Sequence, residues 1–504
     1  MAGHLAYHGD RFSMVKAARS STARGSKYLY YPMDATEPSN QYNPGRDIYS
    51  LPEIPYRTEE DYWDTITQLG QAESKARRAT IVTRTGISRL PMCAAGGAFM
   101  HPTYFPLDPF HLFYENCLPF IWDIWTQHST PDEIFHLGSE AAATFGEMVT
   151  NGIATLPPSF CGPIRNPHLK RNSQYKIFEW MALLHWYIIP LGIELQFAPA
   201  VLANFANFAG GIEAAMTVAS RTTAEITKIF DLFADFLHGF EKIYVGGDPK
   251  KISRCRLCLF QLVHVAQHIF WNGSIRVGSQ ATCERAIGEV GHKIRSKKAP
   301  FVHLANIIFE RELIKILEIK IPALREIATS KHQQTRLSTK SKILKREQVA
   351  GTEFTKQFRA LQDFFEAEGD TAEIEIERRL NELRRDRPGR SSRYFEVCSS
   401  SPLFGEALAF YTRRLPDEST DNLVVYHPIV GLCTEYRQWR GKWGTTVKVA
   451  RVLSIVAVIG IWVGPESQDV HILRKHPGLD LLSAAECGLV SGENNLDDLE
   501  VEDV

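Results

Sequence analysis

The spacing of hydrophobic residues changes near residue 401 of this chain of 504 residues. Upstream, apolar positions recur every three or four residues, as on one face of an α-helix. Downstream, short runs rich in Val and Ile are separated by polar turns, which is typical of β-strands. The helical pattern covers 58–90, 112–126, 130–150, 175–242, 251–270 and 298–329, and the strand pattern covers 423–426, 445–449, 452–463 and 469–473.

The segments between these elements predict how the chain is divided. Residues 1–60 are rich in Gly, Pro, Tyr and Ser, and we expect an irregular to helical N-terminal segment over 1–104. A helical body is expected over 105–350, a charged linker over 351–400 and a small β-rich module over 401–485. Residues 486–504 contain seven acidic residues and no Lys or Arg, so we expect a disordered acidic tail there.

Composition excludes several classes of protein. Hydrophobic residues make up 44% of the chain and charged residues 23%, which is ordinary for a soluble globular protein. The longest apolar run, 452–463, is too short to span a bilayer, so no membrane partner is expected. Nine irregularly spaced Cys suit a reducing, intracellular compartment. The net charge of −1 means that any DNA binding must come from a local patch.

Two short motifs contain residues that are candidates for binding a metal ion or for catalysis. Asp108 and His111 are three residues apart, so on a helix they lie on one face and can hydrogen-bond each other or share a metal ion. The alternative is a helix-capping Asp beside a buried His. Glu284 opens a later helix, where a carboxylate could hold a divalent ion for phosphoryl transfer. Its alternative is a first-turn Glu that is favoured by the helix dipole.

A basic stretch follows Glu284. Residues 290–346 contain fourteen Lys or Arg against four Glu and no Asp. Such clusters contact nucleic-acid phosphates, although a basic helix face is often merely solvated. The residues expected to bind DNA without sequence preference are Lys293, Arg295, Lys297 and Lys298. Residues 338–346 also fit a nuclear localisation signal.

The residues Cys255, Cys258, His264 and His268 are candidate zinc ligands by type, but not by spacing. Only five residues separate the Cys pair from the His pair, whereas a Cys₂His₂ finger has about twelve. The apolar residues among them favour a buried helix instead.

The motifs around Asp108–His111 and Glu284 together resemble the transposases of En/Spm-type (CACTA) DNA elements, especially the fungal members. The aromatic segment 105–116 is similar to the Asp/Cys-x-x-His motif of that family. The Glu284–Arg285 pair with Gly288 and the following basic residues is similar to its last catalytic helix.

The resemblance implies a nuclear enzyme that cuts and joins DNA ends with Mg²⁺, on an RNase H-like core that carries three metal-binding carboxylates. It implies that Glu284 is a catalytic residue and a metal ligand, and that Asp108 and His111 belong to the same catalytic site. The family's first two catalytic Asp residues precede the point that residues 3–10 match. The chain therefore resembles an N-terminally truncated member that lacks these two residues and has lost its activity.

The expected fold is mostly α, with a partial α/β (RNase H-like) core, to which residues 1–104 could contribute, and a small C-terminal β-rich module. The expected function is that of a transposase-derived protein. The alternatives are a non-catalytic DNA- or protein-binding helical protein, and a helical protein in which Asp108, His111 and Glu284 never meet.

An incomplete core should also expose an apolar face and cause self-association. The aromatic helix is the expected location of that face, because the segment with Asp108 and His111 leads straight into it. Its large aromatic residues are Phe113, Tyr114, Phe120, Trp122 and Trp125.

Overall fold

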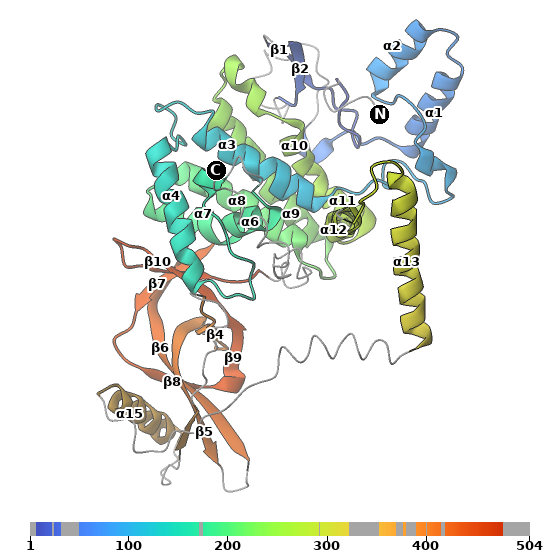
Figure 1. Cartoon of the computed structure of the whole chain (residues 1–504). Helices are drawn as coiled ribbons and strands as arrows, with labels where there is room; N and C mark the ends of the chain where they lie inside the picture. Colours follow the sequence, from blue (N-terminus) through green and yellow to red (C-terminus); the bar gives the residue numbers. More distant parts are fainter. Residues whose placement is uncertain are drawn as a thin grey trace.

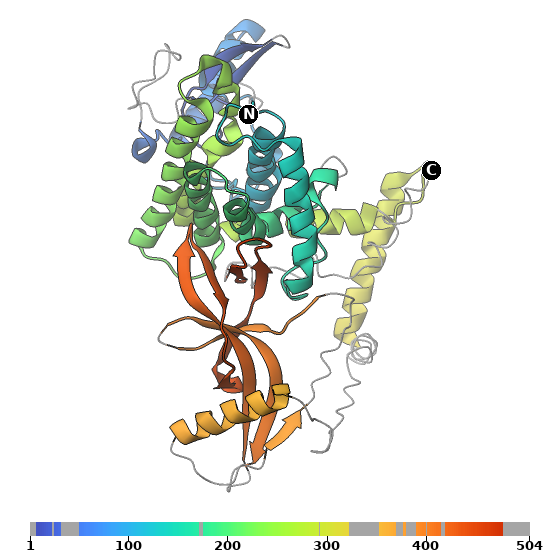
Figure 2. The same cartoon turned by 90° about the vertical axis from the view of Figure 1, so that its left-hand side faces the viewer.

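The computed structural model describes residues 7–22, 25–31, 50–170, 175–291, 293–321, 352–368, 376–379, 390–399, 401–414 and 419–476. These residues form a helical body and a β module, which lie one above the other, and a long helix, α13, stands beside the body (Figures 1 and 2). Among the described residues, all paired strands are antiparallel. The predicted combination of a mostly helical protein with a C-terminal β-rich module is confirmed.

The N-terminal part contains a β-hairpin and a helical hairpin. The elements are β1 (Ala18–Thr22), β2 (Gly25–Leu29), α1 (Glu59–Gly70) and α2 (Lys75–Thr85). Thr58 caps α1 by accepting a hydrogen bond from the backbone N–H of Asp61, and the Asp61 side chain accepts one from Thr58 in return. Gly86 ends α2 with φ +74°, a conformation that favours glycine. The predicted helix over 58–90 is therefore two helices that share a small core of their own.

The helical body surrounds one large hydrophobic core. Its helices are η4 (Phe110–Cys117), α3 (Leu118–Thr126), α4 (Ser139–Gly152), α5 (Pro167–Lys170), α6 (Ile177–Ala182), η6 (Leu183–Tyr187), α7 (Ile188–Glu194), α8 (Pro199–Met216), α9 (Thr223–Phe240), η7 (Glu241–Val245), α10 (Leu257–Phe260) and α11 (His264–Asn272). The elements η4, η6 and η7 are π-helical. Two further helices, α12 (Ala281–Gly291) and α13 (Pro300–Lys320), contact each other beside this body.

The predicted helix start at Thr130 is wrong, because α4 begins only at Ser139. The carboxylate of Glu133 lies 2.7 Å from Arg254 and 2.9 Å from Lys251. Although burial opposes its ionisation, hydrogen bonds from Arg254 and Lys251 lower the pKa of Glu133 to about 2. This pairing holds the segment as a turn against the end of the body, so the predicted helix does not start at Thr130.

The prediction that the aromatic helix exposes an apolar face is also wrong. Phe113, Tyr114, Phe120, Trp122 and Trp125 are all buried. Their rings pack against rings from α4, α8 and α9, in the pairs Trp122–Phe145, Trp125–Phe205 and Phe113–Phe233. The aromatic density of this helix therefore marks the centre of the core.

The β module is a small closed barrel. Its strands are β3 (Ile376–Arg379), β4 (Tyr394–Val397), β5 (Leu403–Arg414), β6 (Thr420–Glu435), β7 (Gln438–Trp443), β8 (Lys448–Arg451), β9 (Ile455–Val458), β10 (Gly460–Val463) and β11 (Val470–Leu473). The strand order runs β10-β11-β7-β6-β5-β4-β9. Only Ile459 separates β9 from β10, so the two ends of this order are one bent strand and the sheet closes on itself.

The prediction of a charged linker over 351–400 is wrong where the structure describes it. Helix α15 (Thr352–Ala367) packs its Leu361 and Phe365 against Tyr411 and Leu423 of the barrel, and β4 is one of the barrel strands. The abundant charged residues of α15 belong to the solvent-facing side of an amphipathic helix. The predicted tail over 486–504 lies outside the described residues.

Polar contacts fix the barrel to the helical body. Glu194, at the end of α7, accepts hydrogen bonds from His471 at 2.8 Å and from Ser467 at 2.9 Å. The indole of Trp186 donates to the carbonyl of Arg474 at 3.0 Å. The guanidinium of Arg390 donates to three carbonyls of the loop after α4, those of Leu156, Pro157 and Cys161. The two parts therefore meet through a defined interface.

A buried polar cluster joins the N-terminal residues to α11. One carboxylate oxygen of Asp10 accepts hydrogen bonds from the hydroxyl of Ser13 at 2.6 Å and from His264 Nε2 at 3.0 Å. Burial opposes ionisation of Asp10, but the charge and hydrogen bond of His264, together with Ser13, lower its pKa to about 2. Burial lowers the pKa of the neighbouring His268 to about 3. The folded protein therefore holds His268 neutral at ordinary pH.

Acid should destabilise the helical body through His268. The pKa of an unfolded His is about 6.5, so between this value and the folded value near 3 only the unfolded chain binds the proton. The contribution to stability is complete above about pH 6.5 and falls by up to about 1.4 kcal/mol per pH unit as the pH decreases. Melting temperatures at neutral and acidic pH should differ less for His268→Gln than for the wild type. An equal loss in both proteins would contradict this assignment.

Candidate functional site

The segment with Asp108 and His111 is positioned by the start of the π-helix η4. One oxygen of Asp108 accepts a hydrogen bond from the backbone N–H of Phe110 at 3.0 Å, and the other contacts Nδ1 of His111. Asp108 therefore both caps the start of the helix and contacts His111, which is partly exposed rather than buried in the core. The π-helix ends at Cys117, two residues before Pro119, which has no N–H to donate to the preceding turn.

Glu284 of α12 reaches the other nitrogen of the same imidazole. Its Oε1 lies 2.7 Å from His111 Nε2, although the two residues are 173 positions apart in the chain. Glu115, one helical turn after His111, lies 3.1 Å from the same nitrogen. The structure thus brings Asp108, His111 and Glu284 together. Glu115 was not among the predicted site residues, although its spacing of four residues from His111 could have indicated it.

A glycine explains how the two segments come so close. Gly278 lies just before α12, and a Cβ atom on it would stand 2.1 Å from the carbonyl oxygen of Leu107. Any other residue would push this backbone away from the residue that precedes Asp108. The absent side chain of Gly278 is therefore a condition for the contact between His111 and Glu284.

The site favours a charged imidazole. Partial burial disfavours the charge, but the hydrogen bond and charge of Asp108, followed by the charges of Glu284 and Glu115, raise the pKa of His111 above its ordinary value. As an imidazolium, His111 donates from Nδ1 to Asp108 and from Nε2 towards Glu284. The Glu284 side chain is half exposed, whereas that of Asp108 is nearly buried. The site is therefore open on the side of Glu284.

A buried series of side-chain hydrogen bonds connects η4 to other helices of the body. The hydroxyl of Tyr114 lies 3.0 Å from His185 Nε2, and His185 Nδ1 lies 3.3 Å from Glu213. Burial raises the pKa of Tyr114, and the nearby charge of Glu213 raises it further. Tyr114 therefore remains a neutral phenol that ties η4 to the π-helix η6 and to α8.

The carboxylates around His111 do not by themselves form a binding site for Mg²⁺. This ion requires several oxygen ligands in an octahedral arrangement. Here the carboxylates lie on opposite sides of an imidazole ring and accept its protons. Among the described residues, no group of three or more His, Cys, Asp and Glu is arranged to hold a metal ion, and this includes the region of Cys255, Cys258, His264 and His268.

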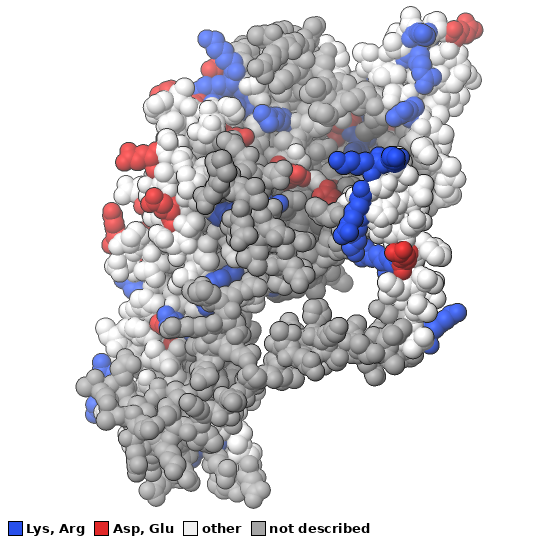
Figure 3. Space-filling model, in the orientation of Figure 1, with Lys and Arg blue, Asp and Glu red and all other residues white. Residues whose placement is uncertain are grey.

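The four predicted DNA-binding residues lie in the connection from α12 to α13. Lys293, Arg295, Lys297 and Lys298 are all exposed, and Figure 3 shows Lys and Arg side chains gathered where these helices meet. At about 1.5 Å per helical residue, the end of α12 at Gly291, just before this connection, is about 10 Å from Glu284 along the helix axis. The basic residues from 325 to 346 lie outside the described part of the chain.

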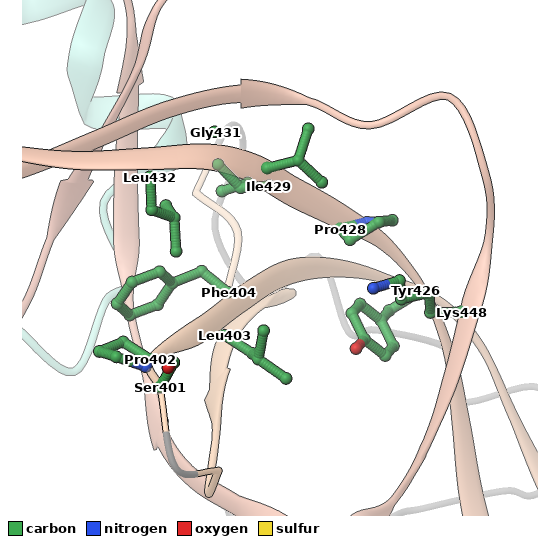
Figure 4. A pocket seen from close by; sticks show the side chains of 11 residues that line it. Ser401, Pro402, Leu403, Phe404, Tyr426, Pro428, Ile429, Gly431, Leu432 and Lys448 are labelled. Atoms are coloured by element: carbon green, nitrogen blue, oxygen red, sulfur yellow. The ribbon is translucent and has the colours of Figure 1, made fainter.

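The barrel carries a separate hollow of about 280 Å³, which is lined mainly by apolar residues that include Leu403, Phe404 and Pro428 (Figure 4). Among the described residues that line it, Lys448 alone is charged. The acid–base groups found around His111 have no counterpart in this lining.

Comparisons with protein families, with curated proteins and with solved structures found no match to this chain. None of the described helices has the length and apolar character needed to cross a membrane.

The contact with Glu284 should be measurable in the titration of His111. Glu284→Gln removes one of the charges that favour the imidazolium, so the pKa of His111 should decrease, and Asp108→Asn should decrease it further. NMR of protein labelled at histidine Cε1 measures this pKa, and His111→Gln identifies the resonance. The matched control is Glu140→Gln, which removes an exposed carboxylate from α4 and should leave the pKa of His111 unchanged. A His111 titration that is unaffected by Glu284→Gln would contradict the contact.

Proposed function

We propose that this chain is a transposase-derived, DNA-binding protein, related to the En/Spm-type (CACTA) enzymes and located in the nucleus. The observation that carries the proposal is the 2.7 Å contact between His111 and Glu284. The resemblance implies that these two motifs share one site, and this contact supports that expectation. In this proposal the helical body corresponds to the large insertion of the family's catalytic domain, beside a partial RNase H-like core.

We assign no DNA cleavage to the described residues. A two-metal mechanism needs carboxylates that converge on ions about 4 Å apart. Asp108, Glu115 and Glu284 instead surround one imidazole and share its protons. Glu284 would serve as a catalytic ligand for Mg²⁺ only together with further carboxylates, as the family's triad implies.

DNA binding is assigned to the connection between α12 and α13. Lys293, Arg295, Lys297 and Lys298 are exposed and directly follow the helix that carries Glu284. Exposed basic side chains commonly contact phosphates, and such contacts carry no sequence information. The binding should therefore be weak and independent of sequence. The alternative, a non-catalytic protein-binding role, is favoured by the exposed apolar surface of α13.

The chain should not nick DNA in the presence of Mg²⁺. Supercoiled plasmid incubated with purified protein should remain supercoiled, because the described carboxylates do not form a pair of metal sites. Magnesium-dependent nicking that disappears in Glu284→Ala would contradict this prediction and would establish an active site.

Reversing the charge of Lys293, Lys297 and Lys298 to Glu should weaken DNA binding. If each lysine neutralises one phosphate, the slope of log affinity against log salt should become less steep by about 3. Fluorescence anisotropy with a duplex at several salt concentrations measures both quantities.

The matched control for this variant reverses three exposed lysines elsewhere in the chain, Lys228, Lys242 and Lys356. It changes the net charge by the same amount and should alter neither the affinity nor the slope. Equal effects of the two triple variants would assign binding to overall charge instead.

A further inference from the structure

The helix α13 exposes an unusual amount of apolar surface. Nine large apolar residues of this helix, and Ile321 directly after it, have exposed fractions between 39% and 81%. They are Phe301, Val302, Ile308, Phe309, Leu313, Ile314, Ile316, Leu317, Ile319 and Ile321. A helix that is apolar on most of its sides is normally found inside a protein. Figures 1 and 2 show α13 standing away from the helical body in both views.

The exposed area is large enough for a stable interface. Ten side chains of this size, each about half exposed, amount to on the order of 1,000 Å². The largest apolar patch on a typical monomer is about 300–600 Å², and a standard protein interface buries about 800 Å² on each partner. The exposed apolar surface of α13 is therefore larger than the apolar patches of a typical monomer.

One stripe of residues along α13, called the seam below, has the spacing needed to pack against a partner helix. Phe301, Ala305, Ile308, Glu312, Lys315 and Ile319 recur at alternating steps of four and three residues, which is the spacing of a coiled coil. Val302, Phe309 and Ile316 flank this seam on one side and widen it. Charged residues in the middle of the helix disfavour a lipid bilayer as the partner.

The charges in the seam favour an identical helix as the partner. Glu312 and Lys315 form an exposed ion pair within α13 at 2.7 Å. In an antiparallel pair of α13 helices, a two-fold axis between positions 313 and 314 places Glu312 opposite Lys315 of the second copy. The same axis places Ile308 opposite Ile319. Over 307–320, where the two copies of α13 overlap, the seam is thus complementary to itself, and a net charge of −1 causes little repulsion between two copies.

We propose that two copies of this chain associate through an antiparallel pair of α13 helices, with Glu312 and Lys315 as the polar layers that set their register. This interface does not depend on the proposed DNA binding, because the basic connection before α13 lies outside the seam. The two symmetry-related Glu312–Lys315 layers lie between the Ile308–Ile319 pairs and favour one register over its alternatives.

Sedimentation equilibrium of the full chain at increasing concentration tests the association. The wild type should be a dimer, and Ile308→Glu with Ile319→Glu should be a monomer at every concentration. The matched control, Leu169→Glu with Val456→Glu, replaces two similarly exposed apolar residues outside α13 and should remain a dimer. All of these residues are exposed, so circular dichroism should be unchanged. A monomeric wild type, undefined aggregates, or a dimer that persists in Ile308→Glu with Ile319→Glu would overturn the proposal.

Charge exchange tests the antiparallel register. Glu312→Lys alone places lysines opposite each other and should raise the dimer dissociation constant roughly tenfold or more. Adding Lys315→Glu restores opposite charges across the axis and should restore most of the affinity. A double variant that is no tighter than Glu312→Lys would overturn the register. Fluorescence anisotropy with duplex DNA is repeated on the variant with Ile308→Glu and Ile319→Glu. It shows whether DNA binding is retained when the dimer is lost, so a failure of the dimer is distinguished from a failure of DNA binding.

Discussion

The contact of His111 with carboxylates from two distant parts of the chain is the interaction on which the candidate site depends. Asp108 orients the imidazole from one side, and Glu284 approaches it from the other. The contact requires the backbone before α12 to touch the residue before Asp108, which only the glycine at position 278 permits. A half-exposed carboxylate is thereby held at a fixed point at the edge of a rigid aromatic core.

The helical body and part of the site could be predicted from the sequence. The three- to four-residue period indicates most helices because each buries one apolar face. The meeting of His111 with Glu284 does not follow from any local pattern, since the residues are 173 positions apart, and only the resemblance to transposases indicated it. The contact of Glu115 with His111 could have been predicted from helical spacing alone. Glu115 is not part of the motif, however, and was not among the predicted site residues.

The remaining differences arise where tertiary contacts override local patterns. The start of the predicted helix over 130–150 forms a turn because Glu133 pairs with Arg254 and Lys251 of a distant segment. The many charged residues of α15 led to the prediction of a linker. Its few apolar residues nevertheless pack on the barrel. Aromatic residues of α3 were expected on an exposed face but lie in the centre of the core. The exposed apolar surface instead belongs to α13, whose sequence alone is typical of a buried helix.

A double-mutant cycle between His111 and Glu284 tests the central claim most directly. Unfolding free energies of the wild type, His111→Gln, Glu284→Gln and the double variant give the coupling between the two side chains. We expect a coupling of about 0.5–1 kcal/mol at slightly acidic pH, after allowance for exposure to solvent. Because the imidazolium is required, the coupling should shrink as the pH rises through the raised pKa of His111. No coupling at any pH would mean that the two motifs do not share a site.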